Sequence, residues 1–311
     1  MNLGKLLVLI ILFVASSFLV LSVNTKKPTI HQLPLKTPTP ISFEVSPLPT
    51  LKDTTNFPIL SAQGVLAVDS DSGVILYQKD IDQKLYPAST TKIMTALVSL
   101  DFYKDDDILT IGKLNAIGQS MHLIEGEKIY FKDLLSGLLI YSANDAAEAL
   151  AQNYTGGRDE FIAKMNEKAK NLNLENTHFV NPTGLDQENH YSTAKDMIRL
   201  SEIAMQNKKF ASIVKTKEKI VRSTDGKLVH YLTNINKLLG TVDGVEGIKT
   251  GWTEEARENL VTFVERNNKK VYIALLGSQD RFGETKELIN WIFFNYEWKN
   301  LAFASYTSQS P

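Results

Sequence analysis

The sequence predicts an α/β fold of the α+β type, in which an antiparallel sheet is flanked by helices. Three observations support this prediction. Two apolar runs around a turn-rich loop predict a β-hairpin over residues 64–77, and a second hairpin is predicted over residues 259–276. Between the hairpins, apolar residues recur at helical spacing in several segments. Strands at both ends with helices between them indicate one sheet, built from the terminal segments and covered by helices.

Each element follows from apolar spacing and turn residues. The first hairpin has strands at 64–68 and 74–77 around a loop rich in Asp, Ser and Gly. A helix begins near Ser89 and carries apolar residues at helical spacing from Ile93 onward. The remaining predicted elements are helices over 134–151, 161–174, 196–206 and 284–294, and strands over 247–253, 259–265 and 271–276, with Asn267-Asn268 as the turn between the last two strands.

The first 58 residues differ from the rest of the chain. Residues 6–23 form a strongly apolar run between lysines, which predicts an N-terminal membrane anchor or a signal segment in residues 1–23. The anchor is favoured because no convincing cleavage site follows the run. Residues 24–58 hold seven of the ten prolines, which is typical of an extended linker. The folded domain is expected over 59–300, followed by a C-terminal tail at 301–311.

Composition excludes some classes of protein. The 311 residues carry a formal net charge of −1, which argues against a nucleic-acid partner. The chain has no cysteine, so disulfides and thiolate metal sites are not available. Its five histidines show no spacing typical of a metal site. These counts argue against a metal site. We expect no organic cofactor either, because the groups that the chemistry described below requires are all in the chain.

Ser89-Thr90-Thr91-Lys92 has the pattern of a serine nucleophile with a lysine base. Positions i and i+3 share one face of a helix, so the two side chains can touch. The lysine must be neutral to accept the hydroxyl proton. Its pKa must therefore be lowered from about 10.4 to near 7, a shift that costs about 4 kcal/mol. Burial and a nearby cation act in that direction. Taken alone, a serine at a helix start is more often an N-cap, which is the interpretation of Ser192 in the similar Ser192-Thr193-Ala194-Lys195.

Two further triplets complete the chemistry. In Ser142-Ala143-Asn144 the hydroxyl could relay a proton, and the amide could orient Lys92 or hold a substrate amide. The alternative role for this triplet is helix capping. In Lys249-Thr250-Gly251, predicted to end a strand, the first two side chains could bind a carboxylate, and Gly251 would allow close approach of a substrate. The alternative here is a plain edge strand.

In this order, the motifs resemble those of the penicillin-binding D-alanyl-D-alanine carboxypeptidases, in the superfamily of serine DD-peptidases and β-lactamases. The resemblance covers roughly residues 59–300. The matching segments are Pro87-Ala88-Ser89-Thr90-Thr91-Lys92, Ser142-Ala143-Asn144-Asp145-Ala146-Ala147, Asn181-Pro182-Thr183-Gly184-Leu185, Tyr191-Ser192-Thr193-Ala194-Lys195-Asp196, Thr233-Asn234-Ile235-Asn236-Lys237-Leu238-Leu239 and Gly247-Ile248-Lys249-Thr250-Gly251.

The resemblance implies a fold and a set of roles. It implies a sheet between helical layers plus a helical lobe, with the active site between them. Ser89 would be the nucleophile, Lys92 the general base and Ser142 the proton relay. Asn144 would position the peptide, and the backbone N–H groups of Ser89 and Trp252 would form the oxyanion hole. The terminal carboxylate would bind Lys249 and Thr250.

The chain departs from the family pattern after its strand motif. Ala256-Arg257 stands where the family commonly has Ala-Gly, and Arg257 would strain the turn if that position has a positive φ. Many relatives also carry a C-terminal β domain with an amphipathic anchor, so membrane attachment is expected through residues 6–23 instead.

We expect an extracytoplasmic serine DD-carboxypeptidase that removes the terminal D-alanine from peptidoglycan stem peptides and is inhibited covalently by β-lactams. Three alternatives remain. A β-lactamase is disfavoured because Asn181-Pro182 stands where class A enzymes place a deacylating Glu-Pro. A DD-endopeptidase would use the same residues. An inactive peptidoglycan-binding homologue would keep the cleft and lose activity through Arg257.

Overall fold

The computed structural model describes residues 46–52 and 56–300, all within one compact unit that begins at residue 45. The predicted anchor or signal segment, most of the predicted linker and the predicted tail lie outside the described residues. None of the helices in the described part combines the length and apolar character that crossing a bilayer requires.

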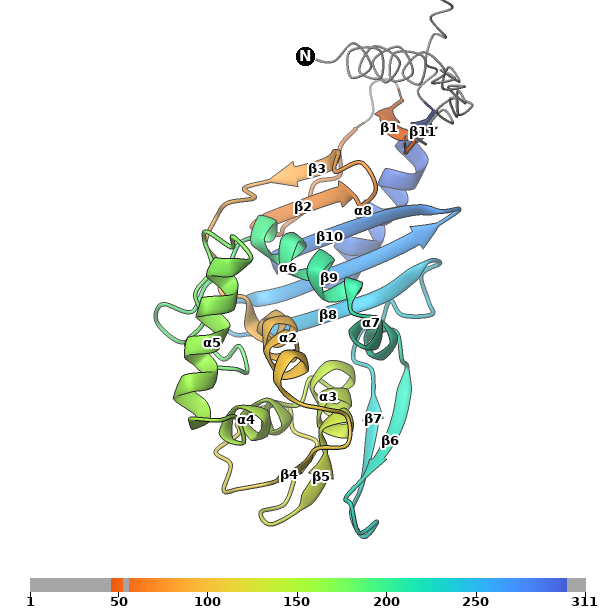
Figure 1. Ribbon diagram of the computed structural model, residues 1–311. Helices are drawn as coiled ribbons and strands as arrows, with labels where there is room; N and C mark the ends of the chain where they lie inside the picture. The colour runs from red at the N-terminus through yellow and green to blue at the C-terminus, as the bar shows by residue number, and fades with distance from the viewer. Residues whose placement is uncertain (1–45, 53–55, 301–311) are drawn as a thin grey trace, which may run out of the picture. The chain divides into compact units, whose positions relative to one another are not determined.

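The elements of this unit follow one another in a fixed order (Figure 1). They are β1 (Leu48–Leu51), β2 (Gly64–Asp69), β3 (Ile75–Lys79), the 3-10 turn η1 (Ala88–Thr91), α2 (Lys92–Phe102), β4 (Ile108–Thr110), β5 (Lys128–Tyr130), α3 (Phe131–Ile140), α4 (Asn144–Gln152), α5 (Gly157–Asn171), α6 (Ala194–Gln206), α7 (Lys208–Val214), β6 (Glu218–Arg222), β7 (Val229–Thr233), β8 (Val245–Thr253), β9 (Arg257–Arg266), β10 (Lys269–Ser278), α8 (Arg281–Asn295) and β11 (Tyr296–Lys299).

The predicted antiparallel sheet is confirmed. Its strand order is β3-β2-β10-β9-β8, so the N-terminal hairpin pairs with β10 from the C-terminal part of the chain. Both predicted hairpins are present. The turn between β9 and β10 has φ values of 50° at Asn267 and 59° at Asn268, which suits a two-residue turn with both central residues left-handed. β8, which carries the Lys-Thr-Gly triplet, is an edge strand of this sheet.

Two hydrophobic cores lie on the opposite faces of the sheet. On β2, Leu66 and Val68 belong to one core, whereas Val65 and Ala67 belong to the other, as the alternation of side chains along a strand requires. Helix α6 covers the first face and α8 covers the second (Figure 1). The sheet is therefore sandwiched between helical layers.

The first core continues into a helical lobe formed by α2, α3, α4 and α5, with the short β4–β5 and β6–β7 pairs at its far end (Figure 1). Helix α2 lies inside this lobe, because every residue from Lys92 to Ser99 is buried. Its N-terminal end contacts the sheet through η1, which packs against β8 and β9. The start of α2 therefore lies where the lobe meets the edge strand of the sheet.

The predicted helix over 134–151 was wrong as a single element. It divides into α3 and α4, with Tyr141, Ser142 and Ala143 between them. Ser142 has a φ of 61°, which interrupts the helix, and the Asn144 N–H donates to the Gln119 carbonyl at 2.7 Å. A long-range hydrogen bond thus replaces the helical one, and the Ser142 side chain lies at a break between helices.

Two smaller predictions also need correction. The N-cap of α6 is Thr193, whose Oγ1 accepts from the Asp196 N–H at 3.0 Å, rather than Ser192. Ser192 is buried, and its Oγ lies 2.8 Å from Thr177 Oγ1. Residues 48–51, predicted as linker, form β1 and pair with β11, because backbone pairing with the C-terminal strand overrides the proline signal at Pro49.

Arg257 has the positive φ that was expected from the sequence to strain the turn at this position. Its φ is 57°, at the point where β9 begins after the turn from β8. A residue with a Cβ in this region loses about 1–2 kcal/mol relative to a right-handed conformation. The β8–β9 turn of this chain is therefore strained at Arg257.

Candidate active site

Ser89 lies in a tight 3-10 turn immediately before α2. The turn is entered through Ala88, which has a φ of 47°, and Thr90 closes it by donating from its N–H and its Oγ1 to the Pro87 carbonyl. Ser89 itself is only partly buried, unlike its neighbours on both sides. The hydroxyl is thus held at a partly accessible position by a hydrogen-bonded turn.

Lys92 brings its amine against that hydroxyl. Its Nζ lies 2.8 Å from Ser89 Oγ, 2.6 Å from Asn144 Oδ1 and 2.6 Å from the Thr183 carbonyl oxygen. A neutral amine has two N–H groups and one lone pair, whereas an ammonium has three N–H groups. Asn144 Oδ1 and the Thr183 carbonyl can only accept, so they take the two N–H groups. The lone pair of the neutral form then points toward the Ser89 hydroxyl.

Burial favours that neutral form. Lys92 is completely buried, and desolvation lowers its pKa from 10.5 to about 7, although Asp145 and Glu148 act in the opposite direction. A lysine base requires a pKa near 7, and burial of the Lys92 side chain is the cause of such a value here. A substantial fraction of the protein therefore carries a neutral Lys92 at neutral pH.

Asn144 is positioned by the loop between β4 and β5. Its Nδ2 donates to the Ile117 carbonyl at 2.6 Å, which leaves Oδ1 facing Lys92. The neighbouring Asp145, at the start of α4, accepts from the Ser120 hydroxyl and from the N–H groups of Met121, Leu123 and Ala146. A buried carboxylate at the N-terminus of a helix thus holds this loop, and the loop orients the amide.

Ser142 and Lys249 form the second directly bonded pair. Lys249 Nζ donates to Ser142 Oγ at 2.7 Å and to the Thr250 carbonyl at 3.0 Å. Burial lowers the pKa of Lys249 well below its usual value, and the charges of Lys92 and Arg281 lower it further. The charge of Lys92 thus lowers the pKa of Lys249, whereas burial is what lowers the pKa of Lys92.

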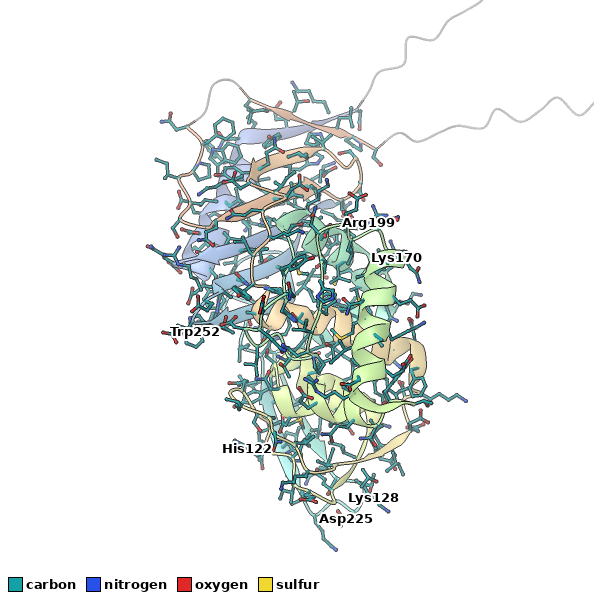
Figure 2. The ribbon with its side chains drawn as sticks, turned by 90° about the vertical axis from the view of Figure 1, so that its left-hand side faces the viewer. His122, Lys128, Lys170, Arg199, Asp225 and Trp252 are labelled. Carbon is teal, nitrogen blue, oxygen red and sulfur yellow. The ribbon has the colours of Figure 1, made fainter. Side chains whose placement is uncertain are left out.

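Thr250, Gly251 and Trp252 are consecutive residues of β8, the edge strand that η1 contacts. Thr250 Oγ1 is buried and has no hydrogen-bond partner among the described residues. A Cβ on Gly251 would lie 3.0 Å from the Ser89 nitrogen, so glycine allows the two backbones to approach closely. The Trp252 side chain is 63% exposed and projects from the edge of the sheet (Figure 2).

Sequence reasoning missed Arg281. This residue begins α8, donates from Nη1 to the Gly251 carbonyl at 2.8 Å, and has a buried Nε without a partner among the described residues. Its guanidinium therefore lies beside the residue that follows Thr250, and its charge contributes to the lowered pKa of Lys249. No local signal in the sequence could have identified it, because Gly251 and Arg281 meet only through the packing of α8 on the sheet.

Sequence reasoning also missed the role of the loop at 181–186. Its Thr183 carbonyl binds Lys92, and Asn181 Oδ1 accepts from the Thr183 N–H, the Thr183 hydroxyl and the Gly184 N–H. Gly184 has a φ of 88°, and a Cβ there would lie 1.8 Å from the Ala88 carbonyl oxygen. The motif was recognised, but its contact with Lys92 depends on tertiary structure.

A neutral histidine supports the junction of η1 and α2. His190 is buried, and burial lowers its pKa to about 3, with smaller contributions from His178 and Lys92. The Val180 N–H donates to Nδ1, so the proton is on Nε2, which donates to Thr91 Oγ1 at 2.9 Å. His190 therefore holds the residue next to Lys92 without adding a charge.

The family model for D-alanyl-D-alanine carboxypeptidases matches residues 52–280. This chain belongs to that family. The resemblance seen in the ordered motifs is thereby confirmed, and so is the fold: the crystal structure of the Streptomyces K15 DD-transpeptidase is 34% identical, with a TM-score of 0.73 over 77% of this chain and 100% of that one.

Two relatives of this chain carry different names, one a carboxypeptidase and the other an endopeptidase. The D-alanyl-D-alanine carboxypeptidase DacF of Bacillus subtilis is 36% identical over 247 residues, which cover 76% of this chain and 63% of DacF. This chain therefore spans less than two thirds of the length of DacF. The D-alanyl-D-alanine endopeptidase of Pseudomonas aeruginosa is 33% identical over 241 residues, covering 75% of this chain and 77% of that protein.

In this family member, the residues predicted from sequence lie together where η1 and α2 meet the edge strand β8. Ser89, Lys92 and Asn144 are joined by hydrogen bonds, as are Ser142 and Lys249. Among the described residues, no hydrogen bond joins Ser142 to Ser89 or Lys92 directly. The arrangement offers the Ser89 hydroxyl beside the buried Lys92 amine, and the buried amine of Lys249 next in sequence to the unpartnered Thr250 hydroxyl. That combination suits nucleophilic attack on a substrate that ends in a carboxylate.

Proposed function

We propose that this protein is a serine D-Ala-D-Ala carboxypeptidase that removes the terminal D-alanine of peptidoglycan stem peptides through an acyl-enzyme on Ser89. The observation that carries this proposal is the contact of Lys92 Nζ with Ser89 Oγ at 2.8 Å, with both other neighbours of that amine being acceptors. Family membership supports the choice of substrate.

In the acylation step, neutral Lys92 takes the Ser89 proton while Oγ forms a bond to the carbonyl carbon of the penultimate D-alanine. The carbonyl electrons move onto oxygen, which the backbone N–H groups of Ser89 and Trp252 stabilise. The electrons on oxygen re-form the C=O bond and the C–N bond breaks, while the departing nitrogen takes, through Ser142, the proton that Lys92 had accepted. Free D-alanine leaves, and Lys92 is neutral again. Water subsequently hydrolyses the ester, with Lys92 as general base, and regenerates Ser89.

The substrate carboxylate is assigned to Lys249, Thr250 and Arg281. Thr250 Oγ1 is a buried donor without a partner among the described residues, and an ionised ligand oxygen would satisfy it. A carboxylate would also raise the pKa of Lys249, so substrate binding restores the charge that burial suppresses. This coupling makes the free carboxylate part of the recognition and favours removal of a terminal residue.

Acylation of Ser89 by a labelled penicillin, followed by peptide mapping, tests the nucleophile. Release of D-alanine from a pentapeptide ending in D-Ala-D-Ala tests the reaction. Ser89→Ala must abolish both signals. Label on another residue, or equal labelling of the alanine variant, rules out the mechanism.

Endopeptidase activity is the second candidate, because the Pseudomonas aeruginosa relative carries that name. Cross-linked dimers of peptidoglycan stem peptides, incubated with the protein, would then yield monomeric stem peptides. Pentapeptides would not lose D-alanine. A β-lactamase receives less support, since no carboxylate hydrogen-bonds to Ser89 or Lys92 among the described residues. Penicillin is expected to remain on Ser89 for many minutes, whereas rapid release of hydrolysed penicillin would favour the lactamase.

The proposal extends to the location of the enzyme. Residues 6–23 are assigned as a membrane anchor, and the proline-rich segment that ends before β1 as a tether that places the catalytic domain outside the cytoplasmic membrane. The prediction is that full-length protein sediments with membranes, whereas a chain lacking residues 6–23 does not.

A further inference from the structure

We infer that Asp186 is a positioning residue that fixes the end of β8 relative to the nucleophile. This inference rests on the proposed function and adds a residue to it. Within the described part of the chain, the Asp186 carboxylate hydrogen-bonds to Thr253 and Glu255 and to none of the proposed catalytic side chains. It acts through the backbone that carries them.

The loop at 181–186 contacts both halves of the site. At one end, the Thr183 carbonyl accepts from Lys92 Nζ at 2.6 Å, and Gly184 packs against the Ala88 carbonyl. At the other end, Asp186 Oδ1 accepts from Thr253 Oγ1 at 2.7 Å, and Oδ2 accepts from the Glu255 N–H at 3.3 Å. One short segment therefore joins the base and the nucleophile's backbone to the last residue of β8.

The loop itself is stiff enough to transmit position. Asn181 accepts three hydrogen bonds from within it and donates from Nδ2 to the Leu185 carbonyl at 2.9 Å. The Leu185 N–H donates to Thr183 Oγ1 at 3.3 Å. Thr253 Oγ1 in turn accepts from the Ala256 N–H at 3.1 Å, so the bond from Asp186 also organises the β8–β9 turn.

The region held in this way is the one on which the chemistry depends. β8 carries the carboxylate-binding residues, and a Cβ on Gly251 would lie only 3.0 Å from the Ser89 nitrogen. β8 is also an edge strand, so only β9 supports it from within the sheet. The strained Arg257 follows directly after the turn. Asp186 thus supplies a second support for β8, from the side of the nucleophile. A displacement of about 1 Å there can lower the rate by about a hundredfold.

The test is a double-mutant cycle on Asp186 and Thr253 in the full-length protein. We expect Asp186→Ala and Thr253→Val each to lower kcat for D-alanine release, and the rate of acylation by penicillin, by about tenfold. KM should change by less than about threefold, because only the alignment in the transition state is lost. The kcat of the double variant should be at most about twofold lower than that of either single variant, because each single variant already lacks the hydrogen bond between Asp186 and Thr253.

Two controls separate positioning from a general loss of structure. Thr253→Ser keeps the hydroxyl and should retain nearly all activity. The matched control is Asp225 in the β6–β7 turn, which lies far from Trp252 at the end of β8 (Figure 2). Its carboxylate also caps a turn, because it accepts from Ser223 Oγ and the Lys227 N–H. Asp225→Ala should leave kcat unchanged.

Each remaining outcome rejects the inference. It fails if Asp186→Ala keeps the kcat of the unmodified protein, if the losses from Asp186→Ala and Thr253→Val multiply, or if Thr253→Ser is as slow as Thr253→Val. It also fails if Asp225→Ala lowers kcat as much as Asp186→Ala does. Failure of the proposed function would look different, because the unmodified protein itself would then release no D-alanine and take up no label at Ser89, and the inference would fall with it.

Discussion

Lys92 Nζ lies 2.8 Å from Ser89 Oγ, and the two other atoms within hydrogen-bond distance of that amine, Asn144 Oδ1 and the Thr183 carbonyl oxygen, can only accept. The amine therefore uses its N–H groups elsewhere and turns its lone pair to the hydroxyl when it is neutral. Burial, which lowers the pKa of Lys92 to about 7, makes the neutral form accessible near neutral pH. The contact with Ser89 and the lowered pKa of Lys92 thus both support the proposal that Lys92 is the base.

The rate of acylation by penicillin should rise with pH through an apparent pKa of about 7, as Lys92 loses its proton. The lysine is charged and inactive below that pH, and neutral and active above it. Stopped-flow measurements between pH 5.5 and 9 would show the rising limb. A rate independent of pH across this range would contradict the assignment of Lys92 as the base.

Asn144→Asp should move that limb to higher pH. A carboxylate 2.6 Å from the amine stabilises the ammonium form, so the pKa of Lys92 should rise by about one unit or more. The same pH series measures the shift. Asn171→Asp, at an exposed site on α5, is the matched control and should leave the profile in place.

Gly184→Ala should abolish acylation. The added Cβ would lie 1.8 Å from the Ala88 carbonyl oxygen, so the backbone that carries Ser89 has to move. Gly226 also has a positive φ, but no atom lies within 4 Å of its Cβ position. Gly226→Ala should therefore cost only about 1 kcal/mol of backbone strain and leave acylation intact. Labelling with penicillin and urea unfolding of both variants would separate the two effects, and full labelling of Gly184→Ala would refute the contact.

Thr250→Val should lower activity without lowering stability. The substitution keeps the shape and removes a buried hydroxyl that has no partner among the described residues, so the free energy of unfolding should stay equal or rise by up to about 1 kcal/mol. We expect kcat/KM for D-alanine release to fall about tenfold, because the substrate carboxylate loses a donor. Thr262 Oγ1 is likewise buried without a partner, and Thr262→Val should leave kcat/KM unchanged. Equal kinetics for the two variants would remove Thr250 from the carboxylate site.

Arg257→Gly should stabilise the protein by about 0.5–1 kcal/mol. Glycine relieves the strain of a φ of 57°, although it also gives the unfolded chain more freedom. Arg222→Gly, in strand β6, is the control and should destabilise, because glycine there relieves no strain. Urea midpoints would measure both changes.

D-alanine release by the unmodified chain would also exclude the inactive-homologue alternative, whereas activity only in Arg257→Gly would support it.

The sequence by itself determined the sheet, the main helices and the chemical groups of the site. Alternation of apolar residues and the Asn267-Asn268 turn are local signals, and Ser89 and Lys92 are close in sequence, so neither needs a distant partner to be recognised. Those features were predicted and found. The domain limits outside the described residues and the roles of the site residues stay predictions.

Tertiary structure alone decided which groups complete the site and in what state. Lys249 bonds to Ser142 across 107 positions, Lys92 to Thr183 across 91, and Arg281 to Gly251 across 30. The break at Ser142 arises because a distant carbonyl takes the Asn144 N–H. The pKa of Lys92 depends on how completely other segments exclude water from it. Burial and long-range hydrogen bonds are properties of the packed chain, and no local pattern of residues encodes them.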